Sequence, residues 1–319
     1  MNALTLYLSL ALVAAAPMAA AQDTFPNKPV RFVNNFPAGG PSDLLARSVA
    51  AVLQETLKQP FVVENKAGAA GNIGAADVAK SAPDGHTVLF GIDTTFTVNP
   101  HLYPTMPFKR SDFKPVVVMA SSGLLVGVNP ATGIKTLAGM IEMGKTKGLN
   151  FSSAGSGSPG HLAVEVIKES TQAKITHIPY RGNTPAVTAV LSGEVDGGVL
   201  ATPGMLPHVQ TGKITALAVT SRQRSRLAPE LPTVAEAGLK SLEQEVLYVV
   251  MAPAATPDAV VQTLQKHIID ALKRPDIQTR MSTLDLFYEG LTGAQASQRI
   301  EALHTRYGPI VKATGMKVE

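Results

Sequence analysis

Two Gly-rich stretches contain the residues of this sequence whose types and spacing could support chemistry. The first is FPAGGPSD, Phe36 to Asp43, and the second is FSSAGSGSPGH, Phe151 to His161. Each leads into a run with the apolar spacing of a helix. Ser158 and His161, three residues apart, could act as a nucleophile and its base, or both stretches could bind an anion through backbone amides.

The serine hydrolase hypothesis depends on the residues around Ser158. A nucleophile elbow needs a glycine two residues before and two residues after the serine, but Ser158 has Ser156 before it and Gly160 after it. At the start of a helix, Ser158 is typical of an N-cap and His161 of a polar group in the first turn. We therefore predict no catalytic residue, and keep a secreted hydrolase using Ser158 and His161 as the alternative.

Metal and cofactor sites have weak support in the sequence. The chain has no cysteine, and none of its seven histidines has a partner at H-x-x-x-H spacing, so the commonest zinc patterns are missing. GAAGNIG, Gly68 to Gly74, has neither the terminal Gly-Lys-Ser/Thr of a phosphate loop nor the spacing of a dinucleotide turn. The sequence predicts no metal and no cofactor.

The anion hypothesis explains both Gly-rich stretches. Glycines allow the backbone to approach a ligand closely, and the unpaired amides of a helix start favour negative charge. Pro41 suits a first helical turn because that position has no use for an N–H. Two such turns, far apart in sequence, predict an anion clamp with two lobes. DTTFT, Asp93 to Thr97, follows an apolar strand and could face the same cleft, although a plain strand-end turn explains it equally well.

The elements that position these stretches alternate between apolar strands and amphipathic helices. VRFVNNF precedes the first stretch, and the helix after Pro41 has an apolar face at Leu45, Val49, Val52 and Leu53. A second set begins after LLVGVNP and contains the second stretch. This alternation predicts an α/β fold with mainly parallel sheets flanked by helices, and the chain length predicts two domains.

The N-terminus indicates export. Residues 1–21 are mostly apolar and end in the A-x-A pattern of a signal peptide cut before Gln22. A membrane anchor is the alternative, but the segment is short for a span of about 20 residues and is interrupted by Pro17. The formal charge is only +4, with scattered Lys and Arg and no Trp, which argues against nucleic-acid binding.

The chain resembles the Bug family, the extracytoplasmic solute receptors of the tripartite tricarboxylate transporter system. The runs that carry the resemblance follow in order along almost the whole mature length: FPNKPVRFV, FPAGGPSDLLAR, VVENKAGAAGNIGA, APDGHTVLFG, LNFSSAGSGSPGHLA, IPYRG, SGEVD, LPHVQTGKITALAVTSRQRS and LPTVAEAG. The resemblance implies a periplasmic binding protein of the Venus flytrap kind, with lobe 1 from residues 22–124 and 249–319 and lobe 2 from residues 125–248. The resemblance further implies that the protein acts as a monomer and delivers a small organic carboxylate to membrane permease subunits, or to a signalling system if it is an orphan receptor.

The resemblance also implies which residues hold the ligand. One jaw is Phe36, Ala38, Gly39, Gly40, Ser42 and Asp43, and the other is Ser153, Ala154, Ser156, Gly157, Ser158 and His161. Thr94 and Thr95 are weaker candidates for the pocket wall.

One departure from the family pattern bears on the ligand. Where many members have an acid and an amide, VDGGVLATPGMLPH places Leu200 and Ala201, followed by Thr202 as a further candidate site residue. A buried ammonium group needs an anionic partner. The sequence therefore favours a dicarboxylate or an aromatic carboxylate over an amino acid.

Overall fold

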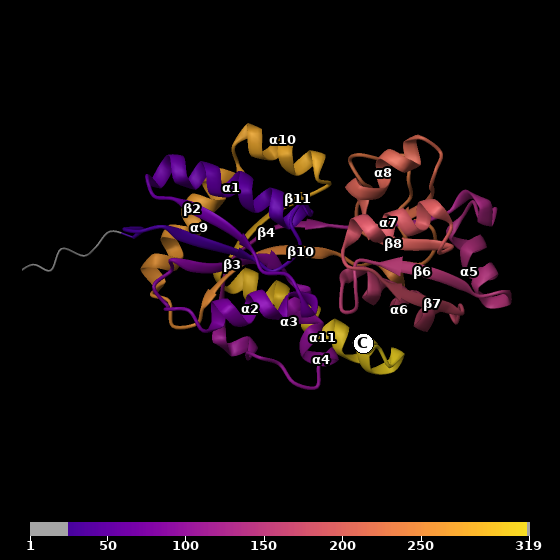
Figure 1. Cartoon of the computed structure of the whole chain (residues 1–319), viewed down its shortest axis with the longest axis horizontal. Coiled ribbons are helices and arrows are strands. Elements are labelled where there is room, and N and C mark those ends of the chain that lie inside the picture. The colour runs from indigo at the N-terminus through magenta and orange to yellow at the C-terminus, as the bar shows by residue number, and fades with distance from the viewer. Residues whose placement is uncertain (1–24, 318–319) are drawn as a thin grey trace, which may run out of the picture.

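The computed structural model describes residues 25–317, so the predicted signal peptide lies outside the described residues. Figure 1 shows two lobes side by side, each a β-sheet flanked by helices. The predicted α/β fold with two lobes is confirmed.

The first lobe is built on a six-stranded sheet with the order β11-β4-β10-β3-β1-β2. Its strands are β1 (Val30–Asn34), β2 (Phe61–Asn65), β3 (Thr87–Ile92), β4 (Phe113–Ser122), β10 (Val246–Pro253) and β11 (Phe287–Thr292). Its helices are α1 (Pro41–Leu57), α2 (Asn72–Ala79), α3 (Thr94–Thr97), α4 (Asn99–Leu102), α9 (Asp258–Leu272), α10 (Pro275–Thr283) and α11 (Gly293–Thr314).

The second lobe is built on a five-stranded sheet with the order β7-β6-β8-β5-β9. Its strands are β5 (Leu124–Val128), β6 (Leu149–Ser153), β7 (Ile175–Pro179), β8 (Gly197–Ala201) and β9 (Thr215–Val219). Its helices are α5 (Leu137–Thr146), α6 (Pro159–Thr171), α7 (Asn183–Ser192) and α8 (Thr202–Gln210).

The sheets are mixed, whereas the sequence predicted mainly parallel ones. Strands β1, β2 and β3 pair in parallel, as do β6, β7 and β8, but β10 is antiparallel to β3 and β4, and β5 is antiparallel to β8 and β9. The difference comes from the crossings between the lobes. Strand β4 leads to β5 through Gly123 alone, and β10 returns to the first lobe, so β4 and β10 must run in opposite directions.

The sequence patterns explain the helix that follows the first Gly-rich stretch. Gly40 is the N-cap of α1 and Pro41 its first residue. The predicted apolar face is buried, with Leu45, Val49 and Leu53 fully inaccessible to solvent. Burial of this face against the first sheet fixes the helix start, and with it the position of the loop before it.

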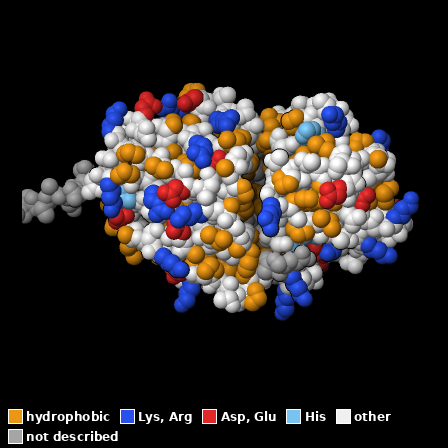
Figure 2. All heavy atoms as spheres, viewed as in Figure 1, with side chains coloured by type: hydrophobic (Ala, Val, Ile, Leu, Met, Phe, Trp, Pro, Cys, Tyr) orange, Lys and Arg blue, Asp and Glu red, His pale blue; other side chains and the backbone are white. Residues whose placement is uncertain are grey.

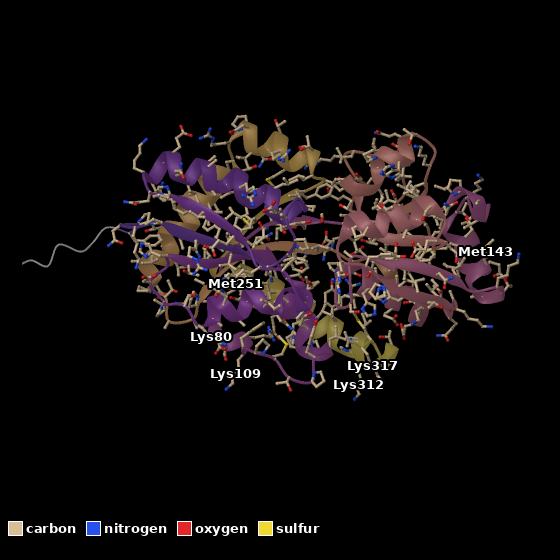
Figure 3. The ribbon with its side chains drawn as sticks, in the orientation of Figure 1. Lys80, Lys109, Met143, Met251, Lys312 and Lys317 are labelled. Atoms are coloured by element: carbon tan, nitrogen blue, oxygen red, sulfur yellow. The ribbon has the colours of Figure 1, made fainter. Side chains whose placement is uncertain are left out.

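Several lysines lie on the outside of this core. Figure 3 shows Lys80, Lys109, Lys312 and Lys317 at the periphery of the molecule, and each is exposed. In residues 25–317, no helix combines the length and apolar character that crossing a membrane requires.

Candidate ligand-binding cleft

A cleft of about 590 Å³ lies between the two lobes. Figure 2 shows a furrow at this boundary, with hydrophobic side chains along its edges. The first lobe contributes Phe36, Pro37, Ala38, Gly39, Gly40, Pro41, Ser42, Leu44, Ile92, Ser122, Val246, Tyr248 and Leu284. The second lobe contributes Leu124, at the start of β5, together with Ala154, Ser158, Pro159, Gly160, Arg181, Gly182, Asn183, Thr184, Pro185, Val199, Leu200, Ala201, Pro203 and Gly204.

The first Gly-rich loop forms one wall and is held in place by Asp43. The backbone N–H of Gly39 donates to Asp43 Oδ2 at 2.9 Å, and Asn65 Nδ2 donates to Asp43 Oδ1 at 2.9 Å. Burial alone would raise the pKa of Asp43, but hydrogen bonds from Gly39, Arg47 and Asn65 hold it below its ordinary value. Asp43 is thus a buried carboxylate that shapes the loop and does not line the cleft.

The start of α1 leaves backbone donors available at this wall. Gly40 has extended backbone angles and provides no side-chain cap. The first N–H groups of a helix have no partner within the helix, and here no capping side chain takes their place. A ligand carboxylate is the kind of group that such a helix start binds.

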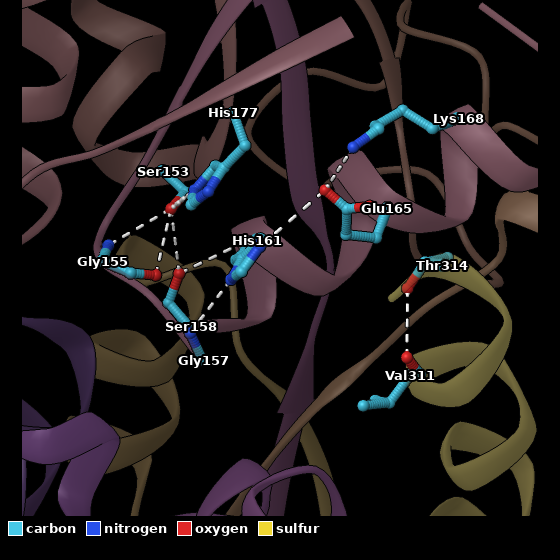
Figure 4. Close-up of polar contacts among 10 residues, drawn as sticks. All are labelled: Ser153, Gly155, Gly157, Ser158, His161, Glu165, Lys168, His177, Val311 and Thr314. Carbon is cyan, nitrogen blue, oxygen red and sulfur yellow. Dashed lines mark hydrogen bonds and ion pairs between the residues drawn. The ribbon is translucent and has the colours of Figure 1, made fainter. Parts of the chain in front are cut away.

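The second Gly-rich loop forms the opposite wall through Ala154 and Ser158. Ser158 is the N-cap of α6, and its Oγ accepts the His161 N–H at 3.3 Å, so the predicted cap is confirmed. Figure 4 shows the network behind this loop. Ser158 Oγ donates to Ser153 Oγ at 3.3 Å, and Ser153 Oγ lies 2.6 Å from His177 Nε2.

Two stacked imidazoles support the second loop. The rings of His161 and His177 lie 3.8 Å apart with an angle of 6° between their planes. Burial lowers the pKa of His161 to about 3 and that of His177 to about 4, so both rings are neutral at ordinary pH. The Gly157 N–H donates to His161 Nδ1 at 3.1 Å, which ties the loop backbone to this pair.

Ser158 and His161 do not form the nucleophile and base pair that the hydrolase alternative requires. A nucleophile and its base share a hydrogen bond, but Ser158 Oγ bonds to Ser153 and to the His161 backbone. The His161 ring accepts from Gly157 at Nδ1, while its Nε2 faces Glu165 at 3.8 Å. Neither ring nitrogen of His161 therefore makes the hydrogen bond to Ser158 Oγ that a general base would need.

The structure places several predicted site residues behind the walls of the cleft. Those that line it are Phe36, Ala38, Gly39, Gly40, Ser42, Ala154 and Ser158. Those outside the lining are Asp43, Thr94, Thr95, Ser153, Ser156, Gly157, His161 and Thr202. Direct ligand contact by this second group stays a prediction, and the geometry gives several of them supporting positions.

The buried threonines illustrate such positions. Thr95 Oγ1 accepts from Asn35 Nδ2 at 2.9 Å and donates to the Ala70 carbonyl at 3.2 Å, so it joins three segments of the first lobe. Thr94 and Thr202 are almost fully buried. Thr202 begins α8, directly after Leu200 and Ala201, which do line the cleft.

Sequence reasoning missed several lining residues. Tyr248 Oη lies 3.2 Å from Ser122 Oγ, and burial raises the pKa of Tyr248 to about 12. Arg181 and Asn183 follow β7, and Asn183 Oδ1 accepts the Ala201 N–H at 2.9 Å. The IPYRG run ends a strand and precedes a helix, so the signal that marked the two Gly-rich loops was available here too.

Comparison with known proteins agrees with the two-lobed geometry. A family model described as the tripartite tricarboxylate transporter family receptor matches residues 45–316. The chain belongs to this family. The resemblance seen in the sequence is confirmed, and the protein is a solute-binding receptor of that family, whose members are periplasmic.

Individual relatives match the receptor over most of their length. Protein BugT of Bordetella pertussis is 34% identical over 309 residues, which are 96% of this chain and 94% of BugT. The structure of R. palustris Rpa4515 with adipate has a TM-score of 0.86 and 31% identity, covering 92% of this chain and 100% of that one. MatC from Rhodopseudomonas palustris with bound malate has a TM-score of 0.81 and 28% identity, covering 90% and 100%.

Proposed function

We propose that this receptor captures a small organic carboxylate between its two Gly-rich loops and delivers it to the membrane permease subunits of a tripartite tricarboxylate-type transporter. A dicarboxylate or an aromatic carboxylate is favoured. The observation that carries the proposal is the cleft itself, in which the start of α1 and the Ser158 cap of α6 face each other across the lobe boundary.

The size and lining of the cleft support this ligand class. A volume of about 590 Å³ falls in the range of small-molecule pockets. Among the lining residues that the structure describes, none is an acid. A ligand ammonium would lose its hydration without gaining a carboxylate partner, which is unfavourable, so an amino acid should bind poorly.

Two relatives support a carboxylate as well, since one was solved with adipate and the other with malate. Both are dicarboxylic acids of a size that such a cleft can hold. In this receptor, the partly exposed side chains of Phe36, Leu44 and Pro203 line the cleft, and a methylene chain or a ring can pack against them.

The proposal includes a binding role without catalysis, closure of one lobe on the other with the chain crossing near residues 124 and 248, and a periplasmic location after cleavage before Gln22. Hinge closure on a ligand is the usual motion of two-lobed receptors. N-terminal sequencing of periplasmic protein should find a start at or near Gln22, and an intact Met1 in the membrane fraction would contradict export in this form.

A thermal-shift screen tests the ligand class. Receptor stripped of ligand would be melted with mono- and dicarboxylates and with matched amino acids, because a ligand that binds the folded state raises the unfolding temperature. We expect stabilisation by carboxylates and no turnover of them. A clear preference for aspartate over succinate, or for phenylalanine over benzoate-type acids, would contradict the proposal.

A further inference from the structure

The charge in the cleft is concentrated on one side chain. Among the lining residues that the structure describes, Arg181 is the only one with a formal charge at neutral pH. The remaining lining residues are apolar, glycine, hydroxyl-bearing or amide. Any charge preference of the cleft beyond its backbone dipoles therefore depends on Arg181.

The Arg181 guanidinium has no protein counter-ion in residues 25–317, where no carboxylate oxygen comes within 4.0 Å of it. Several other arginines are paired with acids, including Arg31 with Glu64 and Arg299 with Glu245. Glu194, the acid that contacts the residue before Arg181, accepts a hydrogen bond from Tyr180 Oη at 2.6 Å. The charge of Arg181 is thus available to a ligand.

The backbone around Arg181 is fixed against the second Gly-rich loop. The Tyr180 N–H donates to the Ser153 carbonyl at 3.1 Å, and the Gly182 N–H donates to the Tyr180 carbonyl at 3.0 Å. A Cβ at Gly155 would lie 3.3 Å from the Tyr180 carbonyl, so loop and turn are in close contact. The turn that bears Arg181 therefore has a defined position at the cleft wall.

The same turn faces the first lobe. A Cβ built on Gly182 would lie 3.9 Å from Pro37 Cγ, and Pro37 belongs to the first Gly-rich loop. Arg181 thus stands where the two lobes meet at the cleft. A group bound by its guanidinium would lie near the boundary that closes over the ligand.

We propose that Arg181 binds a second carboxylate of the ligand and makes the receptor selective for dicarboxylates over monocarboxylates, aromatic ones included. This inference rests on the proposed function, because it assumes that the first carboxylate binds between the Gly-rich loops. The planar guanidinium donates two parallel hydrogen bonds to one carboxylate, and the partly exposed side chains of Leu44 and Pro203 can pack against the methylene chain between the two acids.

Calorimetry on matched acid pairs tests the inference. Succinate, glutarate and adipate would each be compared with the monocarboxylate of the same chain length: butyrate, pentanoate and hexanoate. We expect the wild-type receptor to prefer the dicarboxylate of at least one pair. In Arg181→Gln, affinity for that dicarboxylate should fall about 10- to 100-fold, while affinity for its monocarboxylate partner stays unchanged.

Two further variants keep the test specific. Arg181→Lys retains the charge without the planar guanidinium. Its affinity for the dicarboxylate should lie between those of the wild type and Arg181→Gln. Arg280→Gln removes the same charge from an exposed position of α10 outside the cleft, and should bind as the wild type does.

The outcomes separate this inference from the proposed function. The role of Arg181 is contradicted, while carboxylate binding stands, by any of three results. Arg181→Gln lowers the affinity for both acids of a pair equally, Arg181→Gln leaves the affinity for the dicarboxylate unchanged, or the wild type binds monocarboxylates more tightly. If no carboxylate binds the stripped wild-type receptor, the proposed function itself is contradicted, and the inference with it.

Discussion

At the scale of single residues, the second Gly-rich loop depends on two imidazoles that must stay neutral. His161 accepts from the Gly157 N–H, and His177 lies 2.6 Å from Ser153 Oγ. The rings are buried and stacked at 3.8 Å, so protonating either would place a charge beside its partner without solvent to stabilise it. Burial is therefore the main reason why the pKa of each ring is lowered.

We predict that the receptor loses stability on acidification below about pH 6.5. The folded-state pKa values of His161 and His177, about 3 and about 4, lie below the ordinary value of 6.5. As the pH falls through this window, the unfolded chain binds protons that the folded chain does not, so the free energy of unfolding decreases. Urea unfolding between pH 7 and pH 4 measures the effect.

A matched comparison isolates the two histidines. Asp93 acts in the opposite direction, because burial raises its pKa to about 6 and folding then favours its protonated form. In the double variant His161→Asn/His177→Gln, the free energy of unfolding should therefore change less with pH than in the wild type. In His208→Gln it should change with pH as it does in the wild type. An unchanged slope in the double variant would contradict this account.

Gly157 shows how structure changes the interpretation of a residue. The family resemblance implied that Gly157 belongs to a jaw that holds the ligand, but Gly157 does not line the cleft. Its backbone has φ of +79°, and an added Cβ would lie 2.8 Å from Ala70 Cβ in the other lobe. A side chain at this position would strain the loop and hold the lobes apart.

At the scale of elements, the first Gly-rich loop and α1 form one unit joined by Asp43. Its carboxylate accepts from the loop at Gly39 and from Asn65 at the end of β2. The loop conformation thus depends on a side chain of the first helical turn. This coupling positions the amides at the helix start relative to the sheet.

We predict that Asp43→Ala weakens ligand binding by about tenfold. Losing a hydrogen bond to a charged group costs about 1.5–3 kcal/mol, and a part of this cost reduces the affinity because the loop loses its binding conformation. Calorimetry with the best-binding carboxylate measures the loss. Asp77→Ala is the control, because Asp77 also forms ion pairs, with Arg31 and Lys66, but lies away from the cleft. Equal effects of the two variants would show that Asp43 has no special role in the loop.

Local signals made parts of these elements predictable from the sequence. The apolar spacing after Pro41 predicted the buried face of α1, and the place of Ser158 at a helix start predicted the cap of α6, because both depend on neighbouring residues only. The mixed sheets, the Pro37 contact at Gly182 and the position of Gly157 depend on pairing between distant segments. No short pattern encodes such contacts. Arg181 differs, because it stands in a turn between a strand and a helix and could have been predicted from that pattern.

At the scale of the whole molecule, the lobes meet at contacts besides the cleft. Ser225, in the segment after β9, donates through Oγ to Asp285 Oδ1 at 2.8 Å, and Asp285 precedes β11 of the other sheet. Both residues are buried, and burial raises the pKa of Asp285. The boundaries proposed for the two moving lobes place Ser225 and Asp285 on opposite sides.

We predict that a bound carboxylate makes the receptor more compact, and that Gly157→Val reduces this change. Small-angle scattering with and without saturating ligand should give a smaller radius of gyration for the liganded wild type, because the lobes close on the ligand. The variant should stay more extended, since its valine meets Ala70 from the other lobe. Equal compaction in both proteins would contradict the role given to this contact.

The most direct test of the carboxylate clamp is calorimetry on receptor stripped of ligand, comparing the wild type with Gly40→Ala and Gly40→Val. Gly40 lines the cleft, its φ of −76° suits any residue, and an added Cβ would meet only the Pro37 carbonyl at 3.6 Å. These variants should therefore fold normally, with unchanged unfolding temperatures, while their side chains occupy the approach to the amides of α1. The account predicts one-site carboxylate binding by the wild type, weaker binding by Gly40→Ala, and a loss of about 10- to 100-fold in Gly40→Val; wild-type affinity in a folded Gly40→Val receptor would contradict it.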